Sequence, residues 1–272
     1  MKTPWSLEDI AWDRFDAALA DPDLIRVIKA ASLVEHNAAD YVTYLGNVFP
    51  DDAPFMADMR AWGAEEVQHG RALRRWAELA DTDWDFDAAY TAFTIGFHFS
   101  LEATTSVRGS RAHELLSRCV VEVGTSALYS ALRDATAEPV LRQVCAHIAG
   151  DEFRHYKLFY RHLKRYRAAE NPGVWSRMGA VARRFFEMGD DELAYAYYAA
   201  NGSGGPYDRR RYGRAYTRRV LVHIRYGHVA RGVAMSLKAM GFRPQGFWAR
   251  RVVNFMYAFL RLYGKHLTRF AV

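Results

Sequence analysis

The chain of 272 residues is half apolar and one quarter charged, an ordinary composition for a globular protein with one large core or two small ones. It contains no run of roughly 18 uncharged apolar residues, so we expect no membrane span. The first residues, MKTPWSLEDIAWD, are acidic and lack the apolar centre of a signal peptide, so we expect no secretory leader. Cys119 and Cys145 lie outside any metal-knuckle or redox spacing, which favours a reducing, cytoplasmic setting.

The net charge of +6 divides unevenly along the chain. Residues 1–160 carry 15 Lys and Arg against 25 Asp and Glu, a net of −10, whereas residues 161–272 carry 22 against 6, a net of +16. The C-terminal excess indicates an acidic partner, which could be nucleic acid, a membrane surface or an acidic protein. The alternative is a solvated helical surface rich in arginine.

Helix start and stop signals recur along the whole chain. Asp21-Pro22 is a cap followed by a proline at the first helical position, Phe49-Pro50 ends that helix, and Ser110 caps a later one. No stretch shows the clean alternation of a strand. The pattern predicts an all-α chain, with helices over about residues 22–48, 53–80, 88–107, 111–136, 139–169, 174–188, 190–200, 208–240 and 247–268.

Two pairs of these predicted helices each present a lone glutamate and then, about thirty residues later, a Glu-x-x-His motif. The members of this repeat are, in chain order, Glu35, Glu66, His69, Glu122, Glu152 and His155. The second set follows the first by 87, 86 and 86 residues. A duplicated motif at matching offsets argues against a chance pair of polar residues on a solvated helix face.

The spacing of the repeat suits metal binding. Residues three apart in a helix are neighbours on one face, so each Glu-x-x-His offers an oxygen and a nitrogen toward one point. In an antiparallel four-helix bundle the other two helices add one carboxylate each, which completes the ligand set of a dinuclear carboxylate site. Four carboxylates neutralise two divalent cations, and without metal they would repel one another in the core. Oxygen and imidazole ligands without thiolate suit a di-iron or di-manganese site better than a structural zinc site. We expect two iron ions, with an Mn/Fe pair as the alternative.

The residues around the repeat resemble the soluble acyl-carrier-protein desaturases, a ferritin-like di-iron family. The similarity lies in Trp-x-x-Glu-Glu-x-x-His-Gly from Trp62 to Gly70, in Glu122 followed by Thr125, and in Cys145 followed by Ile-Ala-x-Asp-Glu-x-x-His ending at His155. It covers about residues 25–165. The resemblance implies that the six residues of the repeat are the metal ligands and that Thr125 lies beside the oxygen-binding face. Three regions differ from that family: the acidic connector DTDWDFD (residues 81–87), the predicted helix before Ser110, and the basic tail after residue 170.

Several neighbours of the repeat are candidates for supporting roles. Glu65 and Asp151 each precede a ligand glutamate, about 100° round the helix, and either could bond the histidine of the opposite helix or be an exposed carboxylate. We place Trp62 with them. Thr125 could serve catalysis at bound oxygen or bond back to its own helix.

Other residues near the ligand helices are candidates for a substrate channel. We predict channel positions for Tyr41, Cys119 and Cys145, although buried thiols also serve as core. Tyr44, Phe93, Phe97 and Phe99 supply further bulky walls, either of a channel or of the core. Glu102, at 50 residues from Glu152, and His147, about 140° off the ligand face, are excluded as ligands.

These observations predict a ferritin-like antiparallel four-helix bundle with additional N- and C-terminal helices. Residues 1–170 would form the di-iron bundle, and residues 171–272 a basic helical extension packed on it within a single domain. The predicted function is a non-haem di-iron oxidase that activates O2 to desaturate or hydroxylate an organic substrate. That substrate could be an acyl chain on an acidic carrier protein docked at Arg clusters 209–214 and 249–251.

The sequence has no flavin or nicotinamide fingerprint, so electrons would come from an external reductase or ferredoxin-like donor, and we expect a homodimer. Other functions stay open: a ferritin-like protein that stores metal or reduces peroxide, a di-iron N-oxygenase, a tRNA-modifying hydroxylase that binds nucleic acid, or a bundle that has lost redox activity.

Overall fold

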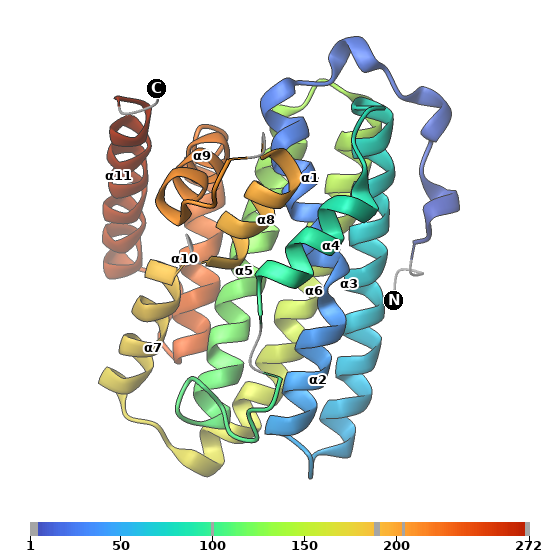
Figure 1. The fold of residues 1–272 in the computed structure, drawn as a ribbon. Helices are drawn as coiled ribbons and strands as arrows, with labels where there is room; N and C mark the ends of the chain where they lie inside the picture. The colour runs from blue at the N-terminus through green and yellow to red at the C-terminus, as the bar shows by residue number, and fades with distance from the viewer. Residues whose placement is uncertain (1–4, 99–100, 188–190, 203–204, 270–272) are drawn as a thin grey trace.

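The computed structural model describes residues 5–98, 101–187, 191–202 and 205–269, and every regular element in these ranges is helical (Figure 1). The predicted all-α class is therefore confirmed. The α-helices are, in chain order, α1 (Pro22–His36), α2 (Ala38–Val48), α3 (Ala53–Ala80), α4 (Phe86–Gly96), α5 (Arg111–Ala135), α6 (Pro139–Glu170), α7 (Val174–Phe186), α8 (Asp191–Asn201), α9 (Arg209–Leu221), α10 (Tyr226–Met240) and α11 (Phe247–Arg269). None of the described helices combines the length and apolar character needed to cross a bilayer.

Two helical hairpins form the centre of the molecule. In the first, α1 and α2 lead into α3 through residues 49–52, and in the second, α5 leads into α6 through residues 136–138 (Figure 1). The hairpins meet because α5 packs along α6, α1 packs on α3, and α3 also contacts α6. The result is a helical bundle; its assignment to the ferritin-like fold stays a prediction.

Local sequence signals set the starts of these long helices. The Asp21 carboxylate accepts hydrogen bonds from the backbone N–H groups of Asp23 and Leu24, at 2.7 and 3.1 Å, and Pro22 occupies the first helical position. Glu138 caps α6 in the same way, and it also accepts a hydrogen bond from the buried Trp76 indole at 2.7 Å. The cap of α6 is thus tied to the core of α3.

Three predicted boundaries are wrong. The helix predicted over residues 22–48 is interrupted at Asn37, whose side-chain amide bonds Asp40 at 2.9 Å and accepts a hydrogen bond from Tyr90 at 3.1 Å. The helix predicted over 88–107 ends at Gly96, because the next residue is extended. The helix predicted over 208–240 divides into α9 and α10, since Arg225 is extended and its N–H bonds His228 Nδ1.

The additional N-terminal helices are, over residues 5–21, three short 3-10 helices, at Leu7–Asp9, Trp12–Arg14 and Ala17–Leu19. The C-terminal helices surround one side of the bundle. Helix α8 packs on α1 and α4, α7 and α10 pack on α5, and α11 packs on α9 and α10. The division into residues 1–170 and 171–272 stays a prediction.

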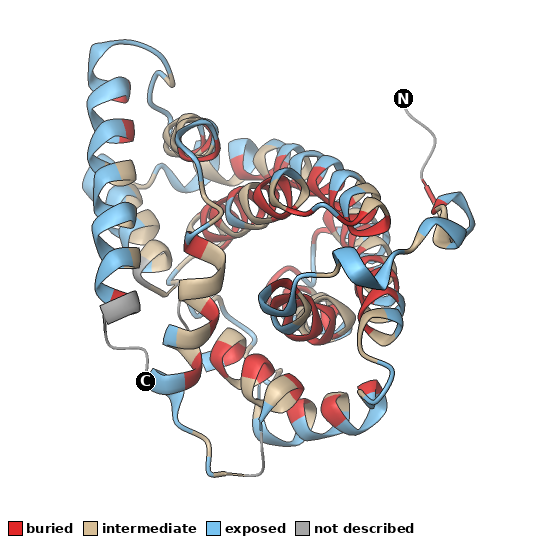
Figure 2. Ribbon diagram, turned by 90° about the horizontal axis from the view of Figure 1, so that it is seen from above, coloured by how far each residue is buried: buried red, intermediate tan, exposed pale blue. Residues whose placement is uncertain are grey.

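The core has two apolar clusters with a polar layer between them. On α3, Phe55 and Met59 belong to one cluster, and Leu73 and Trp76 belong to the other. Glu66 lies between these two groups and is itself 5% exposed. Helices α5 and α6 pass through both clusters in the same way, and Figure 2 shows the buried positions of the long helices turned inward. Burying this charged layer is unfavourable, and the packing of the apolar clusters on either side offsets that cost.

The approach of α1 to α3 generates a first prediction. A Cβ added at Gly70 would lie 2.6 Å from the His36 backbone N, whereas a Cβ at Gly150 on α6 meets nothing within 4 Å. Gly70→Ala should therefore destabilise the fold by roughly 1–3 kcal/mol through overpacking. Gly150→Ala, which also flanks a residue of the polar layer, should stabilise it by about 0.5–1 kcal/mol. Urea unfolding measures both, and equal effects would contradict the close approach.

Candidate metal centre

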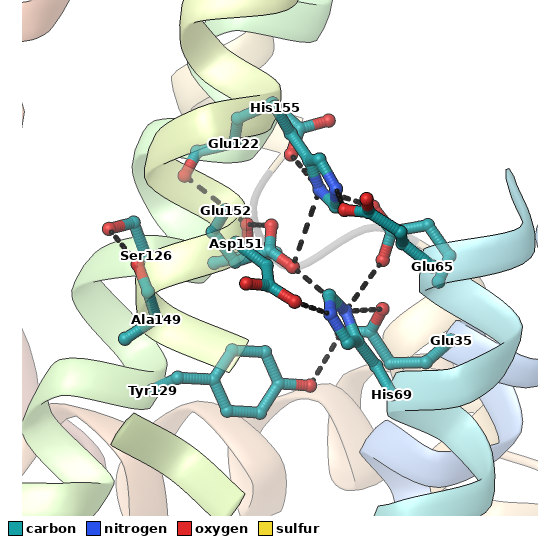
Figure 3. A network of polar contacts seen from close by, with 12 residues as sticks. Glu35, Glu65, His69, Glu122, Ser126, Tyr129, Ala149, Asp151, Glu152 and His155 are labelled. Atoms are coloured by element: carbon teal, nitrogen blue, oxygen red, sulfur yellow. Dashed lines mark hydrogen bonds and ion pairs between the residues drawn. The ribbon is translucent and has the colours of Figure 1, made fainter. Parts of the chain in front are cut away.

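Four helices bring the residues of the repeat to one place in the polar layer. Glu35 comes from the last turn of α1, and each of α3, α5 and α6 contributes from its middle (Figure 3). Except for Glu35, which is half-buried, these side chains are buried. Two overlapping groups result, each with ligand atoms within 4.8 Å of one another: Glu35, Glu66, His69 and Glu152, and Glu66, Glu122, Glu152 and His155. This Glu/His cluster could hold a metal ion.

The two histidines turn the same ring atom toward the cluster. His69 Nδ1 lies 3.1 Å from Glu66 and 3.3 Å from Glu152, while Glu35 is 4.0 Å away. His155 Nδ1 lies 3.0 Å from Glu66 and 3.7 Å from Glu122. Glu66 and Glu152 are therefore common to both ends of the cluster.

The oxygen and nitrogen atoms of the cluster suit metal ions, because hydrogen bonds within the protein leave some of them without a partner. Among the described residues, Glu122 Oε2, Glu152 Oε1 and His155 Nδ1 are buried and have no hydrogen bond. Buried polar atoms in native proteins nearly always have a partner, so each such atom calls for an explanation. All three belong to one of the two candidate groups. A cation between them would satisfy them together.

The pKa values of the cluster show how its own residues balance their charges. Burial raises the pKa of Glu35 and of Glu122 well above the usual range, and the neighbouring glutamates add to this effect. Burial also opposes ionisation of Glu66, but its ion pair with His155 at 3.0 Å and the hydrogen bond from His69 at 3.1 Å hold its pKa well below normal. Burial lowers the pKa of each imidazole, yet carboxylate partners outweigh it, raising the pKa of His155 to about 9 and that of His69 well above its usual value. Protons thus occupy places that cations would take.

A second layer of charges orients the histidines. Asp151 on α6 accepts a hydrogen bond from His69 Nε2 on α3 at 3.1 Å, and Glu65 on α3 accepts one from His155 Nε2 on α6 at 2.8 Å. These are the crossed contacts predicted from sequence. Arg154 joins the two carboxylates, since it bonds Asp151 and, at 3.0 Å, Glu65. With Nε2–H held outward, release of the proton on Nδ1 would turn that nitrogen's lone pair toward the cluster.

Trp62 and Thr125 contact the cluster in different ways. The Trp62 indole is buried, its Nε1 has no hydrogen bond, and its ring lies edge-on to His155 with centroids 6.4 Å apart. It therefore supports the site by packing and makes no polar contact with a ligand. The Thr125 hydroxyl bonds Glu152, and it also lies 3.3 Å from the carbonyls of Val121 and Glu122. The hydroxyl therefore makes both of the contacts considered from sequence, one with a residue of the cluster and one with its own helix.

Two contacts with the site were missed from sequence. The Tyr129 hydroxyl donates to Glu35 at 2.5 Å, and Tyr129 lies seven residues after Glu122, two helical turns along the same face. That periodicity could have identified it. Trp5 donates its indole N–H to Asp151 at 2.7 Å and stacks on His69 and His147. No local pattern in the N-terminal segment indicates this contact.

A cavity of about 330 Å³ lies against the cluster, and Glu35, Glu66, Glu122 and Glu152 form part of its wall. Three aromatic residues that were predicted to form bulky walls, Tyr41, Tyr44 and Phe97, also line it. The remainder of the wall is rich in charge, through Arg108, Glu114, Arg118, Arg184, Asp191, Glu192 and Arg209.

The expectation that Cys119 and Cys145 line a channel is not met. Both thiols are buried in the apolar clusters, one in each, and neither belongs to the cavity wall. Burial raises the pKa of both thiols, which keeps them protonated and suits a role as small core residues. Phe93 is likewise core, and Phe99 lies outside the described residues.

Glu102 and His147, excluded as ligands from their spacing, belong to neither candidate group within the described ranges.

Compared with models of known protein families and with curated proteins, the chain matches none of them. The chemistry of the cluster is therefore inferred from its own residues.

The charge balance generates a prediction about metal uptake. Groups whose pKa is raised keep their protons to a higher pH, so a cation must displace those protons. Affinity for Fe(II) or Mn(II) should therefore rise as the pH increases from 6 toward about 9, the pKa of His155, and fall on acidification. Calorimetric titration in two buffers of different ionisation enthalpy should register proton release. An affinity that does not change between pH 6 and 8 would contradict this.

The second layer allows a matched pair of variants. Asp151→Asn keeps the size of the side chain but weakens the acceptor for His69 Nε2–H, so metal affinity should fall by about 10–100-fold. The control is Asp58→Asn, because Asp58 makes the same kind of contact to His162 Nε2, at 2.7 Å, between the same two helices but outside the cluster. Equal losses in both variants, measured by metal titration, would show that the effect is structural.

Proposed function

We propose that the protein is a non-haem di-iron oxidase that activates O2 at the Glu/His cluster to oxidise an organic substrate. The observation that carries this proposal is the overlap of the two candidate groups, which share Glu66 and Glu152. Two shared carboxylates with one glutamate and one histidine at each end match the ligand set of dinuclear carboxylate centres. Two bound iron ions would supply the electrons for O2 reduction. The same ligand set could hold an Mn/Fe pair instead.

Different residues of the chain would hold the ions and keep the ligands in place. Glu35, Glu66, His69 and Glu152 would hold one ion and Glu66, Glu122, Glu152 and His155 the other. The outer carboxylates would fix the imidazole orientation, and Tyr129 would hold Glu35 through its hydroxyl. Thr125 would hold Glu152 on the cavity side, where both residues form part of the wall.

The cavity favours oxidation of a substrate over storage of metal. A site that only stores or passes on ions has no need for an organic-sized space, whereas this cavity reaches the lower end of the range typical of small-molecule sites. It borders all four glutamates of the cluster. A substrate in it would therefore lie beside the ions.

The wall of the cavity also bears on the kind of substrate. Glu114, Arg118 and Glu122 follow one another at four-residue spacing on α5 and all line it. Arg118 is buried, lies 3.5 Å from Glu114 and covers the ring of Tyr41 at 4.3 Å. A compact substrate with a polar or charged group suits this wall better than a long acyl chain. We therefore favour hydroxylation or N-oxygenation of such a molecule over acyl desaturation.

Iron loading without oxygen, followed by exposure to O2, tests the proposal. The metal-free protein should take up two Fe(II) per chain, consume O2 once reduced, and give the Mössbauer spectrum of a coupled ferric pair. Glu122→Ala should lose the coupled pair because one end of the site lacks its carboxylate. Glu102→Ala, which removes an exposed carboxylate outside both candidate groups, should behave as the wild type.

Three results would count against the proposal. If the protein binds no iron, the Glu/His cluster is not a di-iron site. Iron uptake continuing far beyond two per chain would support storage. A coupled pair that never consumes O2 with any reductant would leave a bundle without redox activity. External electron donors can be compared in the same assay by the rate of O2 consumption.

A further inference from the structure

The last helix, α11, carries a row of exposed apolar side chains. Trp248 is 78% exposed, Phe255 70% and Leu262 68%, and Val252 and Phe259 lie between them at 40% and 38%. Their spacings of four, three, four and three residues place all five on one side of a helix. Figure 2 shows α11 at the edge of the molecule, exposed over most of its length. Soluble chains rarely leave such a continuous apolar strip facing water.

The other sides of α11 have different chemistry. Ala249, Val253 and Leu267 are buried and form the side that packs on the rest of the protein. Arg250 and Arg251 are exposed near the start of the helix, and Arg261 and Lys265 are exposed near its end. The sequence of α11 contains no Asp or Glu. The exposed apolar row thus lies between a packed side and a side whose charged residues are all basic.

We propose that α11 docks the protein on an anionic lipid surface. A helix with Trp, Phe and Leu on one side and Lys or Arg beside them, without acidic residues, is suited to lie in the plane of the membrane interface. The aromatic side chains would enter the boundary between headgroups and acyl chains. The arginines would remain at the level of the lipid phosphates, since long basic side chains keep their charge in water while their stems contact apolar surface.

Charge distinguishes this partner from a second copy of the chain. Residues 161–272 carry a net charge of +16, and α11 lies within them, so pairing two α11 surfaces would bring like charges together. An anionic bilayer provides both an apolar layer and negative charge. Nucleic acid would satisfy the arginines but not the row formed by Val252, Phe255, Phe259 and Leu262.

Vesicle co-sedimentation tests this proposal with the full chain. The wild type should bind phosphatidylcholine vesicles containing roughly one-third phosphatidylglycerol, and binding should weaken as the salt concentration rises from about 0.05 to 0.5 M. Phe255→Glu and Trp248→Glu should each reduce the partition coefficient at least tenfold. The control is Ile95→Glu: Ile95 is 68% exposed on α4, close to the exposure of Phe255, and this variant should bind as the wild type.

The remaining outcomes are equally informative. Circular dichroism and thermal unfolding of each variant show that α11 keeps its fold. Equal binding to vesicles of phosphatidylcholine alone would overturn the role of lipid charge, and no binding to either vesicle would overturn the proposal. If light scattering shows a wild-type dimer that Phe255→Glu makes monomeric, the row is an interface between copies of the chain. Binding to a short RNA duplex that α11 variants abolish, without vesicle binding, would assign the surface to nucleic acid.

Discussion

Four glutamates and two histidines meet in a layer between two apolar clusters, and all of them except the half-buried Glu35 are buried. Ionised carboxylates cost several kcal/mol each to bury without compensation. In the metal-free chain, protons on Glu35, Glu122 and the histidines offset part of that cost, as the directions of their pKa values show. Three polar atoms of the cluster still lack a hydrogen bond. Such an arrangement is explained if cations complete it.

The remainder of the bundle serves to hold this layer. Trp5, Arg154 and the carboxylates of Glu65 and Asp151 form an outer network that fixes both imidazoles, while α8 and the loop before α5 enclose a cavity beside the four glutamates. The chain thus places a Glu/His layer that could hold metal ions, a cavity with a charged wall and an exposed basic helix in one molecule. The cavity and α11 lie apart in the molecule. The cavity borders the Glu/His cluster at the centre of the bundle, whereas α11 lies at the edge (Figure 1).

The repeat of Glu and Glu-x-x-His was sufficient to predict which six side chains meet, because residues spaced by whole turns must share a helix face. The crossed contacts of Glu65 and Asp151 followed from the same geometry. The helix breaks at Asn37 and after Gly96 were not predictable, because each is accompanied by a contact with a distant residue. Asn37 accepts a hydrogen bond from Tyr90, and the Tyr195 ring lies where a Cβ on Gly96 would be. The contact of Trp5 with Asp151 spans 146 residues and leaves no local signal. Cys119 and Cys145 lie on helix sides that point into core, a distinction that periodicity alone does not make.

Anomalous diffraction at the iron edge, from crystals of the iron-loaded protein, is the direct test for two ions at the Glu/His cluster. We expect two peaks per chain, about 3.5–4 Å apart, one beside Glu35 and His69 and one beside Glu122 and His155, with Glu66 and Glu152 close to both. A single peak, or iron held elsewhere on the chain while the six side chains keep only each other as partners, would contradict this expectation.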